Sequence, residues 1–223
     1  SYVRSKTFYR NISLKVYIFI NKFMVKKNSE IHLAFSTPIW TSIIPNYEEV
    51  NNRMYNYIKS LQSKSPEGIA KSNLLGWHSQ YFDLEKDDPR YFVNSITGSL
   101  NVVFKDMGWN LKDQETKITS MWSIINKKNA SNERHIHSNN YISAAYYVKA
   151  PNNCGDIVFH DPRSEATFRH PKISKLNRLN SNVFMIEPKA GLLVLFPSYL
   201  YHSVDLNKTD EERIVISFNI NLI

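Results

Sequence analysis

The chain has 223 residues, of which 42% are hydrophobic and 13% aromatic, and its single cysteine is Cys154. This composition predicts a globular protein and excludes intramolecular disulfides and cysteine-rich zinc sites. The net charge is +8, but residues 1–30 hold seven basic side chains and one acidic one, so the remainder is nearly neutral. Nucleic-acid binding is therefore disfavoured, and the single cysteine favours a reducing compartment such as the cytoplasm.

The N-terminal residues contain a short apolar run, Val16–Ile20, between basic residues. This run is too short to cross a membrane, and no small-residue cleavage site follows it. Two interpretations stay open: an N-terminal strand, or an extension over residues 1–23 that precedes a natural start at Met24. With the extension set aside, residues 24–223 are expected to form a single domain, because no linker or repeat divides them.

The first half of the chain carries the pattern of two helices with extended segments before and between them. A strand is predicted over 31–40, where a proline suits a sheet edge, and residues 74–84 are expected to be extended. Helices are predicted over 46–61, with Asn46 as the N-cap, and over 88–108. Apolar residues recur at helical spacing and are expected in the core: Val50, Met54, Tyr57 or Ile58, Leu61, Phe92, Ile96, Leu100, Val103, Phe104 and Met107.

From Lys117 onward the pattern changes to short strands divided by polar turns, which predicts a sandwich or barrel. The predicted strands are 117–126, 133–137, 142–149, 156–160, 183–187, 191–197, 200–204 and 213–221. In the last strand, the odd-numbered residues from Arg213 to Asn219 share one face, and the even-numbered ones from Ile214 to Ile220 share the other. The apolar face is expected to pack under the helices, and the face with Arg213 to line a solvated cavity.

Three histidines form a candidate metal site. His135 and His137 are two residues apart, so on a strand both imidazoles project to the same side, and His202 follows in a distant strand. Neutral imidazole binds divalent iron, zinc, copper and nickel, and three ligands on one face leave the opposite face open. That arrangement suits non-haem iron, which binds a co-substrate and oxygen together.

The residues around this site resemble the iron(II)- and 2-oxoglutarate-dependent oxygenases, whose core is a double-stranded β-helix of the jelly-roll or cupin-like type. The likeness covers about residues 122–219 and is strongest to an oxygenase family of bacteria and phages. Its His-x-His, Ser-Gly-x-Tyr-Tyr and Phe-Pro-x-x-x-x-His motifs appear here at 135–137, 143–147 and 196–202, with Ala144 in place of the glycine. The resemblance implies a mainly β fold, with the core at about 117–223 and N-terminal helices packed on one sheet.

Matched position by position, the resemblance makes His135 and His202 metal ligands and implies iron(II) and 2-oxoglutarate as cofactor and co-substrate. It also implies that Tyr147, Arg213 and Ser217 hold the distal carboxylate of 2-oxoglutarate, a task that suits the planar guanidinium of arginine. The implied reaction uses oxygen, decarboxylates 2-oxoglutarate to succinate and hydroxylates a small-molecule or peptide substrate.

One departure from the superfamily concerns the third ligand, because the usual pattern is His-x-Asp or His-x-Glu and His137 stands in that place. Three neutral ligands would leave the metal one positive charge higher than a set with one carboxylate, which favours anion binding. His137 has the same strand parity as His135, which makes it the favoured third ligand. Asp156, Asp161 or a water molecule in that position are the alternatives.

Other candidates lie nearer the substrate side. Trp122 on a strand, Asn219 on the last strand and Arg163 in a charged loop are candidate substrate contacts, although core packing is the favoured role of Trp122 and solvent exposure is the alternative for Arg163. Two other functions stay open at this stage. One is a cupin-like protein that binds a metal or small ligand without turnover. The other is a three-histidine dioxygenase that ignores 2-oxoglutarate, in which Arg213 would hold a substrate carboxylate.

Overall fold

The computed structural model describes residues 30–168 and 171–223, so the extension predicted over residues 1–23 lies outside the described residues. The chain divides into two units, Ser1–Ser36 and Thr37–Ile223. In the described part of the first unit the side chains are exposed and no residue is in a strand. The prediction of a strand over 31–40 is wrong for residues 31–39, because strand β1 begins only at Trp40 and spans Trp40–Ile43. Phe35 also has a φ of 57°, which a strand does not allow.

Both predicted helices are present, as α2 (Tyr47–Lys64) and α3 (Asp87–Asp106). Asn46 precedes α2 as expected, but its side chain makes no capping hydrogen bond, because its backbone is left-handed with a φ of 52°. Instead, its carbonyl accepts hydrogen bonds from the N–H groups of Glu49 and Val50. The predicted apolar stripes are buried in both helices except at their C-terminal ends, where Leu61 is half-buried and Met107, just beyond α3, is 38% exposed. Of the alternatives Tyr57 and Ile58, Ile58 is the buried one.

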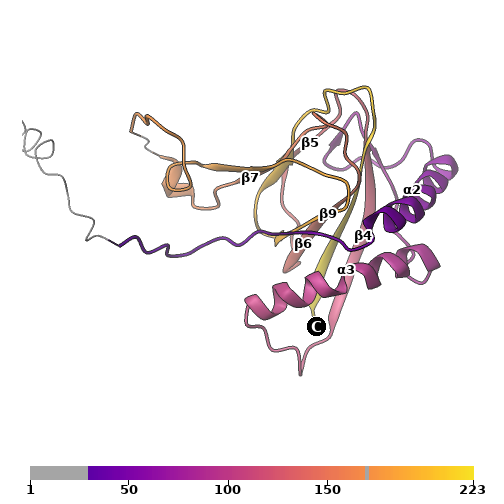
Figure 1. Ribbon diagram of the computed structural model, residues 1–223, viewed down its shortest axis with the longest axis horizontal. Helices are drawn as coiled ribbons and strands as arrows, with labels where there is room; N and C mark the ends of the chain where they lie inside the picture. The colour runs from indigo at the N-terminus through magenta and orange to yellow at the C-terminus, as the bar shows by residue number, and fades with distance from the viewer. Residues whose placement is uncertain (1–29, 169–170) are drawn as a thin grey trace, which may run out of the picture. The chain divides into compact units, whose positions relative to one another are not determined.

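The strands form two antiparallel sheets (Figure 1). The eight strands predicted from Lys117 onward are all present, and each observed end lies within two residues of the predicted end. The larger sheet has the order β1-β9-β6-β11-β4-β3, and the smaller has the order β2-β5-β10-β7-β8. The bounds are β2 Asn73–Leu74, β3 Trp77–His78, β4 Thr116–Asn126, β5 Ser131–His135, β6 Ile142–Lys149, β7 Ile157–His160, β8 Val183–Ile186, β9 Leu192–Pro197, β10 His202–Val204 and β11 Arg213–Leu222. Within the stretch 74–84 that was predicted to be extended, strand residues are found only in β2, which ends at Leu74, and in β3. Leu75, between the two strands, has a left-handed backbone with a φ of 58°.

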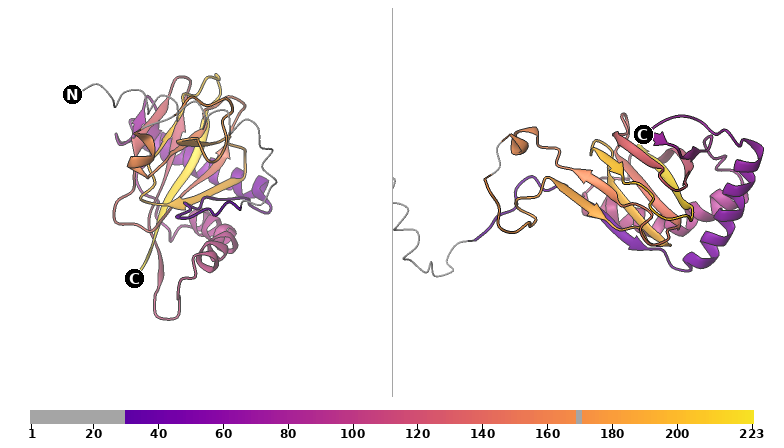
Figure 2. Two further views of the ribbon diagram at one scale, coloured as in Figure 1. Left: turned by 90° about the vertical axis from the view of Figure 1, so that its left-hand side faces the viewer. Right: turned by 90° about the horizontal axis from the view of Figure 1, so that it is seen from above.

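Strand β11 lies between β6 and β4 at the centre of the larger sheet, and its two faces separate as predicted. Its apolar face, with Ile214, Ile216 and Phe218, joins the buried stripes of α2 and α3 in one hydrophobic cluster. Figure 2 shows both helices on the same side of the strands. The predicted fold class is confirmed: mainly β, with the N-terminal helices packed on one sheet.

The other face of β11 looks into the space between the two sheets. A second hydrophobic cluster fills part of this space, with members from both sheets such as Tyr147 and Phe159. The rest is a cavity of about 430 Å³. Across residues 30–168 and 171–223, no helix combines the length and the apolar character needed to span a bilayer.

Candidate metal and co-substrate site

The three predicted histidines converge at one point of this cavity. His135 ends β5 and is the cross-strand partner of His202, which begins β10. His137 follows β5 by two residues, and the ligand atoms of all three side chains lie within 4.8 Å of one another. The prediction that His135 and His137 share a strand is wrong, because β5 ends at His135, but the prediction that their rings converge is confirmed.

Backbone carbonyls orient two of the three rings. Nδ1 of His135 lies 2.6 Å from the carbonyl oxygen of Glu133, and Nδ1 of His202 lies 3.0 Å from that of Leu200. A hydrogen bond from Nδ1 keeps the proton on that nitrogen and leaves Nε2 free to bind a metal. Each of these two rings therefore turns its Nε2, the atom that could bind a metal, away from its backbone partner.

His137 is held differently, through its backbone and its ring. Its N–H donates to the carbonyl of Ser198 at 3.1 Å, and its ring centroid lies 5.5 Å from that of Trp122. The three imidazole centroids are 4.3 to 5.1 Å apart, so the rings surround one small volume.

Burial keeps these imidazoles neutral. Desolvation, followed by the charge of His135, lowers the pKa of His137 to about 4. The same two causes lead among those that lower the pKa of His202 to about 3, and desolvation also lowers the pKa of His135. A neutral imidazole is the metal-binding form, so the site is ready for a cation across the neutral pH range.

Arg213 is a cavity residue whose charged side chain is buried without a full set of hydrogen-bond partners. Its side chain is 1% exposed, and its Nε and Nη1 atoms have no hydrogen-bond partner among the described residues. The guanidinium carbon lies 5.1 Å from the ring centroid of Tyr147, whose hydroxyl is also buried and unpaired. Burial raises the pKa of Tyr147 against the opposing charge of Arg213, so the phenol stays protonated and can donate a hydrogen bond. A buried, unpaired cation is costly, and these groups therefore suggest an anionic ligand.

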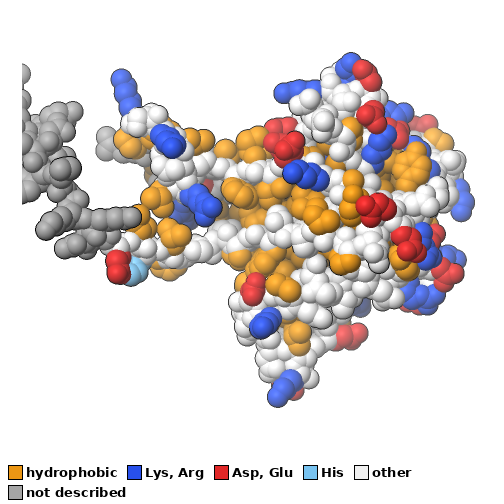
Figure 3. Space-filling view, in the orientation of Figure 1, with side chains coloured by type: hydrophobic (Ala, Val, Ile, Leu, Met, Phe, Trp, Pro, Cys, Tyr) orange, Lys and Arg blue, Asp and Glu red, His pale blue; other side chains and the backbone are white. Residues whose placement is uncertain are grey.

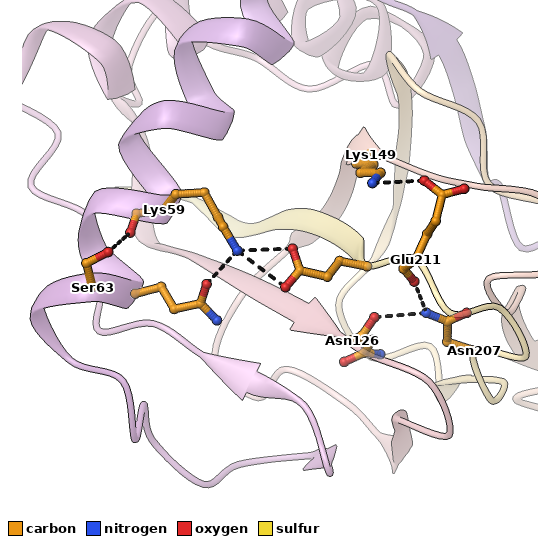
Figure 4. Close-up of polar contacts among 8 residues, drawn as sticks. Lys59, Ser63, Asn126, Lys149, Asn207 and Glu211 are labelled. Carbon is orange, nitrogen blue, oxygen red and sulfur yellow. Dashed lines mark hydrogen bonds and ion pairs between the residues drawn. The ribbon is translucent and has the colours of Figure 1, made fainter.

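Polar contacts fix the turn that leads into Arg213 (Figure 4). The Asn207 side chain donates to the carbonyls of Asn126 at 3.0 Å and Glu211 at 2.7 Å. Glu211 forms a 3.0 Å ion pair with Lys149 of β6, and Glu212 forms one of 3.0 Å with Lys59 of α2. Contacts to α2, β4 and β6 therefore position the backbone on the N-terminal side of Arg213.

The cavity brings together most of the remaining predicted site residues. Ser217, Asn219 and Trp122 line it together with Arg213 and the three histidines. The Asn219 amide is already used within the protein, because it accepts from Ser143 at 2.8 Å and donates to Ser120 at 3.0 Å. Trp122 is 7% exposed and its indole N–H has no hydrogen-bond partner among the described residues, so it remains available to a ligand.

Two predicted residues lie away from the cavity lining. Tyr147 is fully buried, is not among the lining residues and lies beside Arg213. Arg163 is exposed and forms a 2.7 Å ion pair with Asp161. Neither Asp161 nor Asp156 lines the cavity, and among residues 30–168 and 171–223 the histidine triad is the one group of three or more His, Cys, Asp or Glu side chains that could hold a metal ion.

His78 is a cavity residue that the sequence analysis did not single out. Its ring stacks on Trp122 with a centroid distance of 5.6 Å and an interplanar angle of 9°. Its Nδ1 lies 2.7 Å from the carbonyl of Ser79, and it lines the cavity together with the largely exposed Tyr81. The only sequence signal for this aromatic wall is the run of ring-bearing residues between Trp77 and Phe82.

Comparisons with known proteins agree with this geometry. Residues 120–219 match the model of a family described as "Putative 2OG-Fe(II) oxygenase". No curated protein matches the chain.

Solved structures of similar fold include a prolyl-4-hydroxylase from Pseudomonas putida, which is 12% identical with a TM-score of 0.59 over 83% of this chain and 93% of that chain. HygX from Streptomyces hygroscopicus, solved with nickel, 2-oxoglutarate and hygromycin B, is 11% identical with a TM-score of 0.56 over 83% of each chain. SnoN, an α-ketoglutarate-dependent epimerase from nogalamycin biosynthesis, is 12% identical with a TM-score of 0.60 over 82% of this chain and 76% of that chain. At these identities the likeness establishes the fold, the double-stranded β-helix.

Proposed function

We propose that this chain, which belongs to the iron(II)- and 2-oxoglutarate-dependent oxygenases, hydroxylates a small-molecule or peptide substrate while 2-oxoglutarate is decarboxylated to succinate. The observation that carries the proposal is the pairing of two features in one cavity. A group of three neutral imidazoles can hold a cation, and a buried, unpaired guanidinium can hold an anion.

The three histidines fit iron(II). Each offers one ring nitrogen to a common point, and carbonyl groups already fix the tautomers of His135 and His202. Iron(II), when bound, supplies the oxygen chemistry that amino-acid side chains lack. The contribution of the protein is to place three ligands on one side and to leave the remaining positions open to the cavity.

Arg213 and its neighbours fit the distal carboxylate of 2-oxoglutarate. The guanidinium can make two parallel hydrogen bonds to a carboxylate, which would satisfy the Nε or Nη1 donors that are unpaired in the protein. We expect the hydroxyls of Tyr147 and Ser217 to donate to the same group, because Tyr147 lies beside Arg213 and Ser217 is on the same face of β11. The apolar surround strengthens these contacts by excluding water.

His137 as third ligand gives this centre an unusual charge. With a carboxylate in that place, the protein would offset one of the two positive charges of iron(II), whereas three imidazoles offset none. A dianionic co-substrate would then provide the neutralising charge, which ties metal and 2-oxoglutarate binding together. Trp122 and His78 form the wall beside His137, and we assign this wall to substrate binding. Asn219 supports it indirectly, since its amide fixes strands β4, β6 and β11.

Hydroxylation is the reaction of some structural neighbours, whereas SnoN is an epimerase that uses the same co-substrate. Both classes need the two binding features above, and a protein that only binds metal would have no need of the unpaired arginine. The first test is anaerobic addition of iron(II) and then 2-oxoglutarate. A weak charge-transfer band in the visible is expected only when both are present.

The control variants separate the competing functions. Arg163→Ala, which removes an exposed arginine away from the cavity, should leave the band unchanged, and Arg213→Ala should abolish it at the same 2-oxoglutarate concentration. A three-histidine dioxygenase that ignores 2-oxoglutarate would bind iron but show no band in either protein. Release of succinate in the presence of oxygen would exclude a protein that binds without turnover.

A further inference from the structure

Strand β8 has features that the proposed oxygenase reaction does not use. It is the last strand of the smaller sheet, paired on one side with β7, and no described strand lies beyond it. Both of its faces carry exposed apolar side chains: Val183 is 37% exposed, Phe184 54% and Met185 50%. An uncharged edge of this kind is a template for another strand, and proteins normally protect such edges.

The hydrogen bonds of β7 determine which backbone groups of β8 are free. The N–H of His160 donates to Tyr201 on the β10 side, and Asp161 on the next position donates to Asn182 on the β8 side. Because these directions alternate along a strand, Val158 also turns its backbone groups toward β10. Met185, its partner across the β7–β8 pair, therefore turns its N–H and C=O outward.

The backbone N–H and C=O of Val183 also face outward, but the Ser181 side chain partly covers them. The Ser181 hydroxyl donates to the Val183 carbonyl at 2.6 Å and lies 3.3 Å from the Val183 nitrogen. Met185 is consequently the centre of the open edge, with one donor and one acceptor that face away from the sheet.

The charge of the segment that leads into β8 indicates what kind of strand the edge accepts. Residues 171–186 contain three basic side chains, Lys172, Lys175 and Arg178, and no acidic one; the first acid, Glu187, follows the strand. Exposed Leu176 lies between Lys175 and Arg178 in the sequence, and exposed Leu179 follows Arg178. Figure 3 shows hydrophobic and basic side chains beside one another on this face of the molecule. A second copy of this chain would bring three like charges against these three, which disfavours a symmetric dimer through β8.

We propose that the edge of β8 binds an extended, acidic polypeptide segment, which adds to the smaller sheet as a further strand. Main-chain hydrogen bonds to Met185 provide the binding, alternate apolar side chains of the partner cover Val183 and Met185, and acidic residues pair with the cations of 171–186. This inference is independent of the metal site and of the proposed reaction.

The probe is a labelled, acetylated and amidated peptide in which valine alternates with aspartate or glutamate over seven residues. Its binding to the full chain is followed by fluorescence anisotropy at low and at physiological salt. The decisive variant is Met185→Pro, since proline removes the outward N–H while the ladder to β7 does not use that group. Met185→Ile is the matched control, because it keeps the N–H and a similar apolar side chain.

The wild type and Met185→Ile should bind the acidic probe with similar affinity, and Met185→Pro should bind at least about tenfold more weakly. A Lys175→Glu, Arg178→Glu variant keeps the edge and should prefer the same peptide with lysine in place of the acids. If Met185→Pro fails to fold, the peptide preference of this charge-reversed variant tests the proposal. Equal binding by the proline and isoleucine variants would overturn the proposal, as would no preference between acidic and basic peptides. A dimer in solution that Met185→Pro dissociates would also overturn it.

Discussion

Replacing Arg213 by methionine should make the ligand-free protein more stable while removing its affinity for 2-oxoglutarate. The guanidinium is 1% exposed and leaves Nε and Nη1 unpaired, and each buried unpaired donor costs about 1–3 kcal/mol. The nearby Tyr147 ring returns part of this cost through a cation–π contact of about 0.5–2 kcal/mol. Methionine fills a similar volume without a charge to desolvate.

The expected net gain for Arg213→Met is about 1–2 kcal/mol, which for a chain of this length is roughly 2–8 °C in Tm. Loss of charge-assisted hydrogen bonds worth about 1.5–3 kcal/mol should weaken 2-oxoglutarate binding by roughly 10- to 150-fold. Thermal unfolding with and without manganese(II) and 2-oxoglutarate measures both effects, because the ligands should raise the Tm of the wild type far more than that of the variant. If the variant melts well below the ligand-free wild type, Arg213 is a structural residue and the reasoning fails.

Three further predictions concern the metal ligands and the core. His137→Ala should lower metal affinity by at least about 100-fold in a calorimetric titration, while His137→Asp should retain it; equal affinities in wild type and His137→Ala would remove His137 from the ligand set. Metal-free protein should lose stability as the pH falls from about 6.5 toward 4, by on the order of 2–4 kcal/mol, and urea unfolding at pH 7, 6 and 5 measures this loss. The reason is that unfolded histidines bind protons near pH 6.5, whereas His137 and His202 have folded pKa values of about 4 and 3; a flat profile would show that these rings are protonated without penalty. Phe92→Ala should cost about 3–5 kcal/mol, because this ring is 0% exposed between α3 and the larger sheet, and a loss below about 1 kcal/mol in the same assay would contradict that packing.

The sequence by itself determined the elements with strong periodicity. The period-2 pattern of β11 separated the face of Ile214 and Ile216 from the face of Arg213 and Ser217, because a strand must turn alternate side chains to opposite sides. The helical stripes through Met54 and through Ile96 were equally informative, since one buried face of each helix repeats every three or four residues.

The candidate ligand set was also accessible, because the His135-x-His137 pair precedes the apolar strand 142–149 and His202 follows the apolar strand 191–197. The sequence did not reveal which contacts hold each imidazole ring in place. The parity argument placed His137 on β5, yet the strand ends earlier, and a carbonyl of the distant Ser198 and the ring of Trp122 fix its position instead.

The tertiary structure alone decided the rest of the site. It showed that Arg213 is buried without a full set of partners, that the Asn219 amide is already occupied, and that Arg163 lies away from the cavity. It also placed His78 in the cavity wall, which the sequence analysis had not indicated. These outcomes depend on contacts between residues far apart in the chain, and local pattern carries no information about which distant side chain will face a given group. The sequence therefore determined which residues could act, and packing of the two sheets against each other decided which of them meet.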